Sequence, residues 1–190
     1  KKSICTSRSF NGMITDLDGL RTHVSNYAAR CAEKLRQQGT VASIVGVFLN
    51  TNAFREDLPQ YWNFQEMRLT TPSSSTVTIV KAANEVLQKL YRQGYHYKKA
   101  GVIVMGIGPN SPIQPDLFDY NAEQFEKMKR LDAVIDRINK VNGTETIVLG
   151  SQQYPQKDGK GKANVFANAI KHDFKSKNPT TRWSDIIVLK

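Results

Sequence analysis

Cationic and hydroxyl side chains recur along three segments that could contact a nucleic-acid backbone. In a β-strand, side chains two residues apart lie on the same face. Cations and hydroxyls on such a face suit phosphate oxygens, and their contacts are independent of base sequence and weakened by salt. A solvated sheet face would show the same pattern, so the residues alone leave both interpretations open. The candidate DNA-binding residues are Lys2, Thr6, Arg8, Arg68, Thr70, Lys98 and Lys99.

The peptide at residues 114–118, QPDLF, has the composition of a docking motif. Leu117 and Phe118 can enter an apolar pocket on a partner while Gln114 forms a hydrogen bond at the rim of that pocket. The alternative is a loop that folds the two apolar side chains back onto the core of this protein. The position of the peptide, outside regular structure and after a basic region, favours docking.

No pattern in the chain predicts a complete active site. Phosphoryl-transfer enzymes need clustered carboxylates that hold metal ions, and here the acidic residues are scattered. The sequence contains no phosphate-binding GxxxxGK[ST] loop, no HExxH and no cysteine–histidine set with metal-ligand spacing. The three histidines, His23, His96 and His172, stand far from any evident nucleophile. We therefore expect no catalytic activity, metal or cofactor in this chain.

Composition restricts the class of partner. The 190 residues include 27 Lys and Arg against 17 Asp and Glu, a net charge of +10, which favours a polyanionic partner. No stretch is long and apolar enough to span a bilayer, and no secretory signal is visible. Cys5 and Cys31 form no disulfide framework, which favours reduced thiols and a cytoplasmic location. The start at Lys1, without Met, suggests a piece of a longer protein.

The hydrophobic periodicity predicts an α+β fold. Strands are expected at residues 2–10, 41–49, 64–69 and 98–107, and helices at 16–38 and 76–92. The β-α-β-β-α-β order gives a four-stranded sheet with both helices on one face and the opposite face open. The helical stripes that should be buried are Leu17, Leu20, Val24, Tyr27, Ala28, Cys31 and Leu35 in the first helix and Val80, Ala83, Leu87 and Leu90 in the second.

A proline- and glycine-rich stretch at residues 108–115, GPNSPIQP, cannot continue a strand or a helix and marks a boundary. We predict a DNA-binding domain at 1–108, a linker at 109–120 and a small α/β extension at 121–190. The extension should contain a helix at 122–142, a strand at 144–149, a mobile basic stretch at 151–163, a short helix at 164–174 and a terminal strand at 185–189.

These segments resemble the C-terminal part of the UmuC-type DNA polymerases, the Y-family translesion enzymes that include the catalytic subunit of DNA polymerase V. SICTSRSF and AARCAEKLR resemble the start of the family's little-finger domain, and YKKAGVIVMGI resembles its last strand. QPDLF matches the family's clamp-binding motif, and TTRWSDIIVLK resembles its extreme C-terminus. The resemblance runs over nearly the whole chain.

The resemblance implies a division of labour. The family's metal-binding carboxylates, with their Mg²⁺, lie before residue 1, so this chain should lack polymerase activity. The implied partners are duplex primer–template DNA and a sliding clamp bound through Gln114, Leu117 and Phe118. A cleaved UmuD-type accessory subunit and a recombinase filament are implied as well, in SOS mutagenesis at the bacterial nucleoid. The alternative is a protein-interaction scaffold whose basic surface meets an acidic protein.

Overall fold

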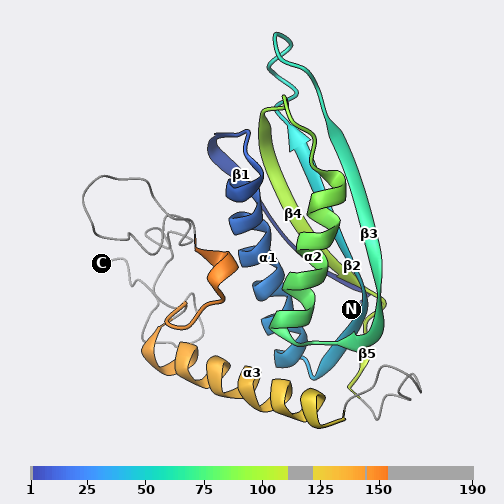
Figure 1. Ribbon diagram of the computed structural model, residues 1–190, viewed down its shortest axis with the longest axis vertical. Coiled ribbons are helices and arrows are strands. Elements are labelled where there is room, and N and C mark those ends of the chain that lie inside the picture. Colours follow the sequence, from blue (N-terminus) through green and yellow to red (C-terminus); the bar gives the residue numbers. More distant parts are fainter. Residues whose placement is uncertain (1, 111–121, 144, 154–190) are drawn as a thin grey trace, which may run out of the picture.

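A four-stranded antiparallel sheet carries two helices on one of its faces (Figure 1). The computed structural model describes residues 2–110, 122–143 and 145–153. The strand order is β1-β4-β2-β3, so β1 and β3 form the edges. The α+β prediction is confirmed. The elements are β1 (Ser3–Ile14), α1 (Leu17–Gln37), β2 (Thr40–Thr51), β3 (Trp62–Ser73), α2 (Thr76–Leu90) and β4 (Tyr97–Met105).

Local signals place the helix ends, whereas pairing sets the strand lengths. Asp16 accepts a hydrogen bond from the Gly19 amide at 2.7 Å and so begins α1, and Gly39 follows its end with φ of +63°. The strand predicted at residues 64–69 is twice as long, because its pairing with β2 continues through polar residues at both ends. Gly108 and Pro109 form β5 against Thr40–Val41, so the stretch that was expected to form no strand begins with a short one, while the predicted domain boundaries stay a prediction.

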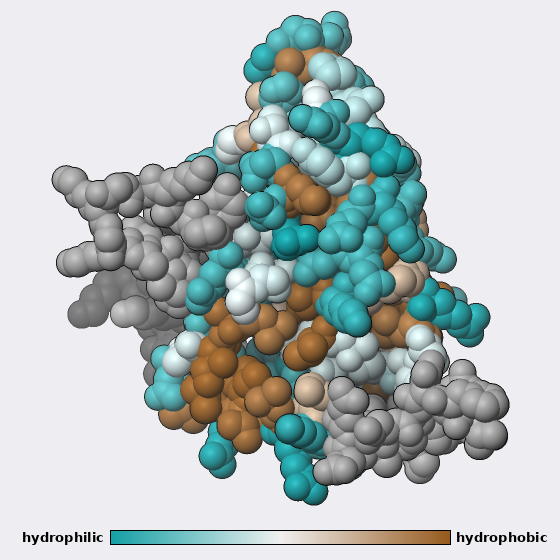
Figure 2. Space-filling model, viewed as in Figure 1, coloured by the Kyte–Doolittle hydropathy of each residue, from teal (hydrophilic) through white to brown (hydrophobic). Residues whose placement is uncertain are grey.

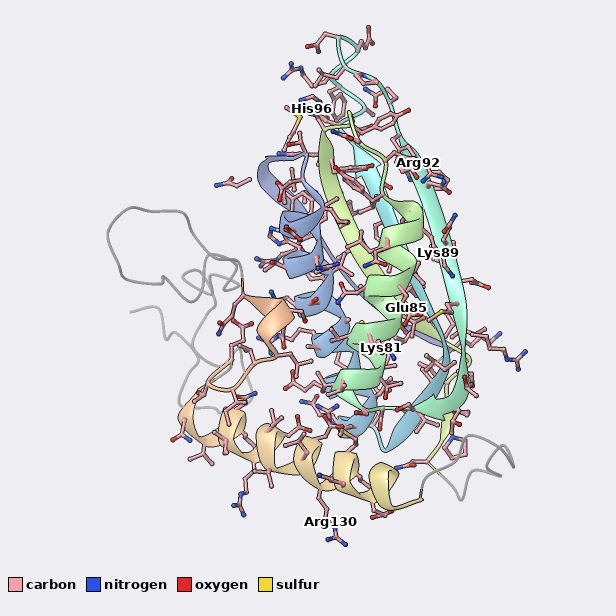
Figure 3. All side chains as sticks on the ribbon, viewed as in Figure 1. Lys81, Glu85, Lys89, Arg92, His96 and Arg130 are labelled. Atoms are coloured by element: carbon pink, nitrogen blue, oxygen red, sulfur yellow. The ribbon has the colours of Figure 1, made fainter. Side chains whose placement is uncertain are left out.

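The hydrophobic core lies between the two helices and the inner face of the sheet. Both predicted helical stripes are buried there, except that Leu17 is only half-buried. The outer side of α2 is polar: Lys81, Glu85 and Lys89 project from it at successive turns, away from the sheet (Figure 3). Each helix therefore has one apolar and one solvated side, which leaves the opposite sheet face as the part of the fold that the helices do not cover.

A third helix, α3 (Ala122–Asn142), has the bounds that the sequence predicts and crosses below α1 and α2 (Figure 1). Among residues 126–142 of this helix, Asp132 alone is buried, and the contacts around it are polar. Arg36 Nε and Nη2 donate to Asp136 at 2.7 Å each, and Asp132 Oδ1 accepts from the Thr76 amide at 3.3 Å. Leu131, on the apolar stripe, is 43% exposed. Figure 2 shows apolar surface over the C-terminal half of this helix.

No strand forms at residues 145–149, the described part of the strand predicted at 144–149. Residues 145–149 make a turn and bends that lead into the short 3-10 helix η1 (Gly150–Gln152). The amide of Ile147 donates to Asn139 Oδ1 at 2.8 Å, so a side chain of α3 takes the place of a partner strand. The segment is tied to the body of the protein through Gln152, whose Nε2 donates to Asn26 Oδ1 at 3.0 Å. The elements predicted beyond residue 153 lie outside the described residues.

Candidate nucleic-acid interface

The open face of the sheet presents four rows of side chains that cross all four strands. Antiparallel register places one residue of each strand in each row. From β1 to β3 the rows are Ser3, Met105, Ile44 and Arg68; Cys5, Ile103, Gly46 and Glu66; Ser7, Gly101, Phe48 and Phe64; and Ser9, Lys99, Asn50 and Trp62. We call this set the open-face grid. No helix of the described residues packs on it (Figure 1).

The centre of the open-face grid is aromatic, and its rings lie against glycine. A Cβ added to Gly46 would meet the Phe64 ring at 2.5 Å, and one added to Gly101 would meet the Phe48 ring at 2.3 Å. Each ring therefore occupies the space that a side chain on the neighbouring strand would fill. Phe64 is 40% exposed. The two rings lie low on the sheet surface, held there by the missing side chains of the two glycines.

Charged and hydroxyl groups surround this aromatic centre. Lys99 Nζ stands 5.9 Å from the centroid of the Phe48 ring, within cation–π range. Arg68 lies at the opposite end of the grid, and Thr70, exposed, follows two residues later on β3. The edge strand β1 contributes serine hydroxyls to three of the four rows. The rim can thus bind phosphate oxygens, whereas the centre suits flat apolar groups.

Two of the predicted DNA-binding residues, Thr6 and Arg8, lie on the helix-covered side of the sheet, so their expected placement was wrong, and a third, Lys98, lies at a register shift of β4 where it binds the backbone of β1. Thr6 Oγ1 accepts from Cys31 Sγ at 3.3 Å, and Lys98 Nζ donates to the Phe10 carbonyl at 2.7 Å. Arg8 lies near Tyr27 of α1. The cause is the burial of Ile4 and Phe10, which turns the even-numbered side chains of β1 towards the helices.

The other predicted residues lie on the open face, just before β1 or outside the described residues. Arg68, Thr70 and Lys99 lie on the open face, and Lys2 is exposed just before β1. The DNA-binding role of all seven residues stays a prediction. The clamp-motif residues Gln114, Leu117 and Phe118 lie outside the described residues.

A second cationic group lies along the outer edge of β1. Lys34 Nζ donates to Thr6 Oγ1 at 3.3 Å, which brings it beside the strand. Arg8 is exposed two residues further along the strand. Burial raises the pKa of the neighbouring Tyr27 to about 12, against the opposing effect of Arg8, so Tyr27 stays neutral there. This edge offers two cations to an anion that approaches from the side.

Sequence reasoning missed the aromatic residues of the grid. Trp62 is 80% exposed, and it continues the face that Phe64 and Phe48 begin. Alternation within β2 does carry the signal, because Phe48 and Gly46 fall between the core residues Val45, Val47 and Leu49. This alternation predicts a shared aromatic surface only when the register of β2 with the two neighbouring strands is known.

Of the three histidines, His23 packs against the hydrophobic core. His23 packs on Phe10 with ring centroids 4.5 Å apart, and burial lowers its pKa to about 4. Within residues 2–110, 122–143 and 145–153, no group of His, Cys, Asp or Glu is placed to hold a metal ion. None of the helices described there is long and apolar enough to cross a membrane.

Comparison with known sequences assigns both portions of the chain. The profile of the impB/mucB/samB family C-terminal domain matches residues 1–117, and that of a domain of unknown function, DUF4113, matches residues 129–189. The chain is 33% identical over 190 residues, its whole length, to "Protein UmuC" of Salmonella typhimurium. It is 31% identical over 186 residues, 98% of its length, to "Protein ImpB" of that species. It spans 42% and 41% of those two curated relatives, less than half of each.

Comparison with solved structures gives weaker similarities. The "Complex of beta-clamp processivity factor and little finger domain of PolIV" matches with a TM-score of 0.41 and 17% identity, over 61% of this chain and 98% of that one. The "Insertion ternary complex of Dbh DNA polymerase" matches with a TM-score of 0.45 and 14% identity, over 57% of this chain and 29% of that one. At such low scores, no functional conclusion rests on these two structures.

Proposed function

The chain belongs to the impB/mucB/samB family, and on this premise we propose that it is the DNA-binding and clamp-docking C-terminal portion of an error-prone translesion DNA polymerase. Nucleotidyl transfer, with its Mg²⁺, then belongs to other portions of the parent protein. Two observations support this division: the chain spans under half of its relatives, and no metal-holding cluster lies in its described residues. On this proposal the protein works on chromosomal DNA in the bacterial cytoplasm, in SOS mutagenesis.

The uncovered sheet face is the observation that carries the DNA-binding proposal. It leaves Arg68 and Lys99 free to meet phosphates at the ends of the grid, and it presents serine hydroxyls along the edge strand β1. Arg8 and Lys34 add two cations at the adjoining edge. Contacts of this kind hold a duplex without reading its bases and release counterions, so binding should weaken steeply as salt rises.

The test is duplex binding at a series of salt concentrations. We expect the chain to bind a primer–template duplex at low salt, and Arg68→Ala with Lys99→Ala to reduce the salt slope by about one for each lost phosphate contact. Arg130→Ala is the matched control, because Arg130 is exposed on α3, away from the sheet (Figure 3). A chain that fails to bind the duplex even at low salt would refute the proposal.

The clamp-docking proposal rests on residues 114–118, QPDLF, which lie in the sequence between β5 and α3. Leu117 and Phe118 would enter an apolar pocket of the sliding clamp, with Gln114 at its rim. We expect Leu117→Ala with Phe118→Ala to abolish capture by immobilised clamp while duplex binding persists. Asp116→Ala, which changes only a spacer position of the motif, should retain capture. Undiminished capture by the double variant would remove the motif from the proposal.

A second candidate role, protein recognition, is favoured by apolar side chains that α3 leaves exposed. Val134 is 47% exposed and Val141 is 76% exposed on this helix. A UmuD-type accessory subunit or a recombinase filament could bind this apolar surface in this family. An acidic protein could instead bind the basic surface of the chain. Val141→Asp should weaken capture of such a partner and leave duplex binding intact. Equal capture by both forms would exclude this surface.

A further inference from the structure

We propose that the open-face grid stacks the bases of single-stranded nucleic acid on Trp62 and Phe64, beside the backbone contacts that hold a duplex. The inference rests on the proposed DNA-binding function and deepens it by naming the form of nucleic acid that this face takes. Base stacking on exposed aromatic rings is tolerant of sequence, because every base has a flat π face. An unpaired template strand next to a lesion would meet that requirement.

The first support is the way in which the sheet holds its rings. Phe64 lies over Gly46 and Phe48 over Gly101, each in space that any other residue would fill with Cβ. A ring that lies low against the strands turns its outer side to the solvent. Two glycines in adjoining rows thus turn an ordinary pleated surface into a flat aromatic one. Trp62, two residues from Phe64 on the same strand, extends this surface with a larger ring that is 80% exposed.

The second support is the distribution of polarity across the grid. Ile44, Ile103 and Met105, on the two middle strands, add apolar surface to that of the aromatic rings, and there they would desolvate a phosphate without pairing it. The cations stand at the ends: Arg68 in the first row and Lys99 in the fourth. Six residues of strand separate these rows, which is roughly 20 Å at the usual rise. Trp62 lies in the row of Lys99 and Phe64 in the next row, so a run of two or three stacked bases, the number that open sheets commonly bind, fits within this length of sheet.

The third support is the contrast between the two forms of DNA. A duplex keeps its bases stacked inside and presents phosphates, which match the rim of the grid but leave its aromatic centre unused. A single strand can turn its bases onto the rings and its phosphates towards Arg68 and Lys99. The positive charge of the chain, +10 overall, complements the strand. Glu66 is the one carboxylate among the residues of the grid.

Fluorescence of Trp62 tests the inference directly. The sequence holds two tryptophans, Trp62 and Trp183, so the full chain carrying Trp183→Phe reports on Trp62 alone. We expect a single-stranded oligothymidylate to quench this fluorescence. In anisotropy titrations, Trp62→Ala should weaken single-strand binding roughly five- to a hundredfold, the range for loss of one stacking residue. The affinity of the Trp62→Ala protein for a blunt duplex of equal length should differ from that of the unmodified protein by less than about twofold, because phosphate contacts remain.

Two variants separate stacking from other effects. Trp62→Phe keeps a ring and should retain most of the single-strand affinity, whereas Phe64→Leu keeps an apolar side chain without a ring and should lose affinity. Phe54→Ala is the matched control, since Phe54 is 93% exposed in the β2–β3 connection and belongs to no row of the grid. Far-ultraviolet circular dichroism and thermal melting of each variant establish that it is folded.

The outcomes separate this inference from the function on which it rests. If the duplex binds but single strands neither quench Trp62 nor lose affinity on Trp62→Ala, the inference is overturned and the proposed function stands. Equal losses for duplex and single strand would also overturn it. If no nucleic acid binds the unmodified chain, the proposed function fails and the inference with it. If Trp62→Ala impairs clamp capture and leaves nucleic-acid binding unchanged, the face belongs to a protein partner, which overturns the inference.

Discussion

Replacing Arg36 with alanine should detach α3 from the body of the protein. Arg36 is the cation at which three helices meet. It leaves the last turn of α1, binds Asp136 of α3 through two hydrogen bonds of 2.7 Å, and donates to the Ser74 carbonyl just before α2 at 2.7 Å. Asp132 Oδ1 stands 3.7 Å from its Nη1. The side chain of Arg36 is 16% exposed and that of Asp132 is 5% exposed.

The size of the expected effect on α3 docking depends on which carboxylate loses its partner when Arg36 is replaced. Asp136, 34% exposed, can be solvated after the loss of Arg36, so that pair contributes about 1 kcal/mol. Asp132 keeps only its bond from the Thr76 amide, and a buried charge without its partner costs about 3 kcal/mol or more. When α3 undocks, Asp132 is exposed to water, so undocking limits the energetic cost of leaving that charge unpaired. We expect the docking equilibrium to shift by about 3 kcal/mol, roughly a hundredfold.

Native-state hydrogen exchange measures this shift locally. The amides of α3 and of the first turn of α2 should exchange roughly a hundredfold faster in Arg36→Ala, because exchange there follows the opening equilibrium. The central amides of β2 and β4 should change little. Arg130→Ala, an exposed cation on the same helix, should change the stability by no more than about 0.5 kcal/mol.

A second substitution tests the stated cause. In the Arg36→Ala protein, Asp132→Asn removes the unpaired charge and keeps an oxygen for the Thr76 amide, so it should restore part of the protection of α3. The reasoning is refuted if α3 amides in Arg36→Ala exchange within about threefold of the unmodified rate, or if Asp132→Asn makes the exchange faster still.

Three further predictions concern groups in and beside the core. Burial lowers the pKa of His23 from 6.5 to about 4, so its contribution to stability is full above pH 6.5 and declines towards pH 4. The melting temperature should fall over that range, and less so in His23→Phe. Burial, the largest cause, raises the pKa of Cys31 to about 11, so a chromogenic thiol reagent at pH 8 should modify exposed Cys5 quickly and Cys31 only in denaturant. Equal rates would contradict this assignment. A Cβ at Gly101 would overlap the ring above it, so Gly101→Ala should lower the free energy of unfolding by about 1–3 kcal/mol in urea titrations. Gly12→Ala, with open space around it, should change it far less.

The helices and their buried sides could be predicted because their signals are local. Asp16, Gly39 and the apolar residues between them specify α1 within a single stretch of chain, and the helix at residues 122–142 was placed at its observed bounds. Helix periodicity and capping depend on neighbours three or four residues away. The order of elements then favoured one four-stranded sheet with both helices on one side.

The faces of the strands could not be predicted in the same way. Thr6 and Arg8 do share one face of β1, and Lys2 lies just before that strand, but nothing within residues 2–10 says whether the helices cover that face. The few apolar residues there, Ile4 and Phe10, pack on the helix side of the sheet and so determine which face of β1 the helices cover. A shift of one residue would reverse every side chain of the strand, so the assignment depends on long-range packing.

Two features exist only in the folded chain. The aromatic surface of the open-face grid combines Phe48, Phe64 and Trp62 with glycines on neighbouring strands, so it requires three strands in register. The docking of α3 depends on Asp132 and Asp136 meeting Arg36, about a hundred residues away in sequence. The sequence by itself determined the family, the order of elements and the helical core, because those depend on neighbouring residues. Tertiary structure decided which chemistry faces the solvent, since that depends on partners distant in the chain.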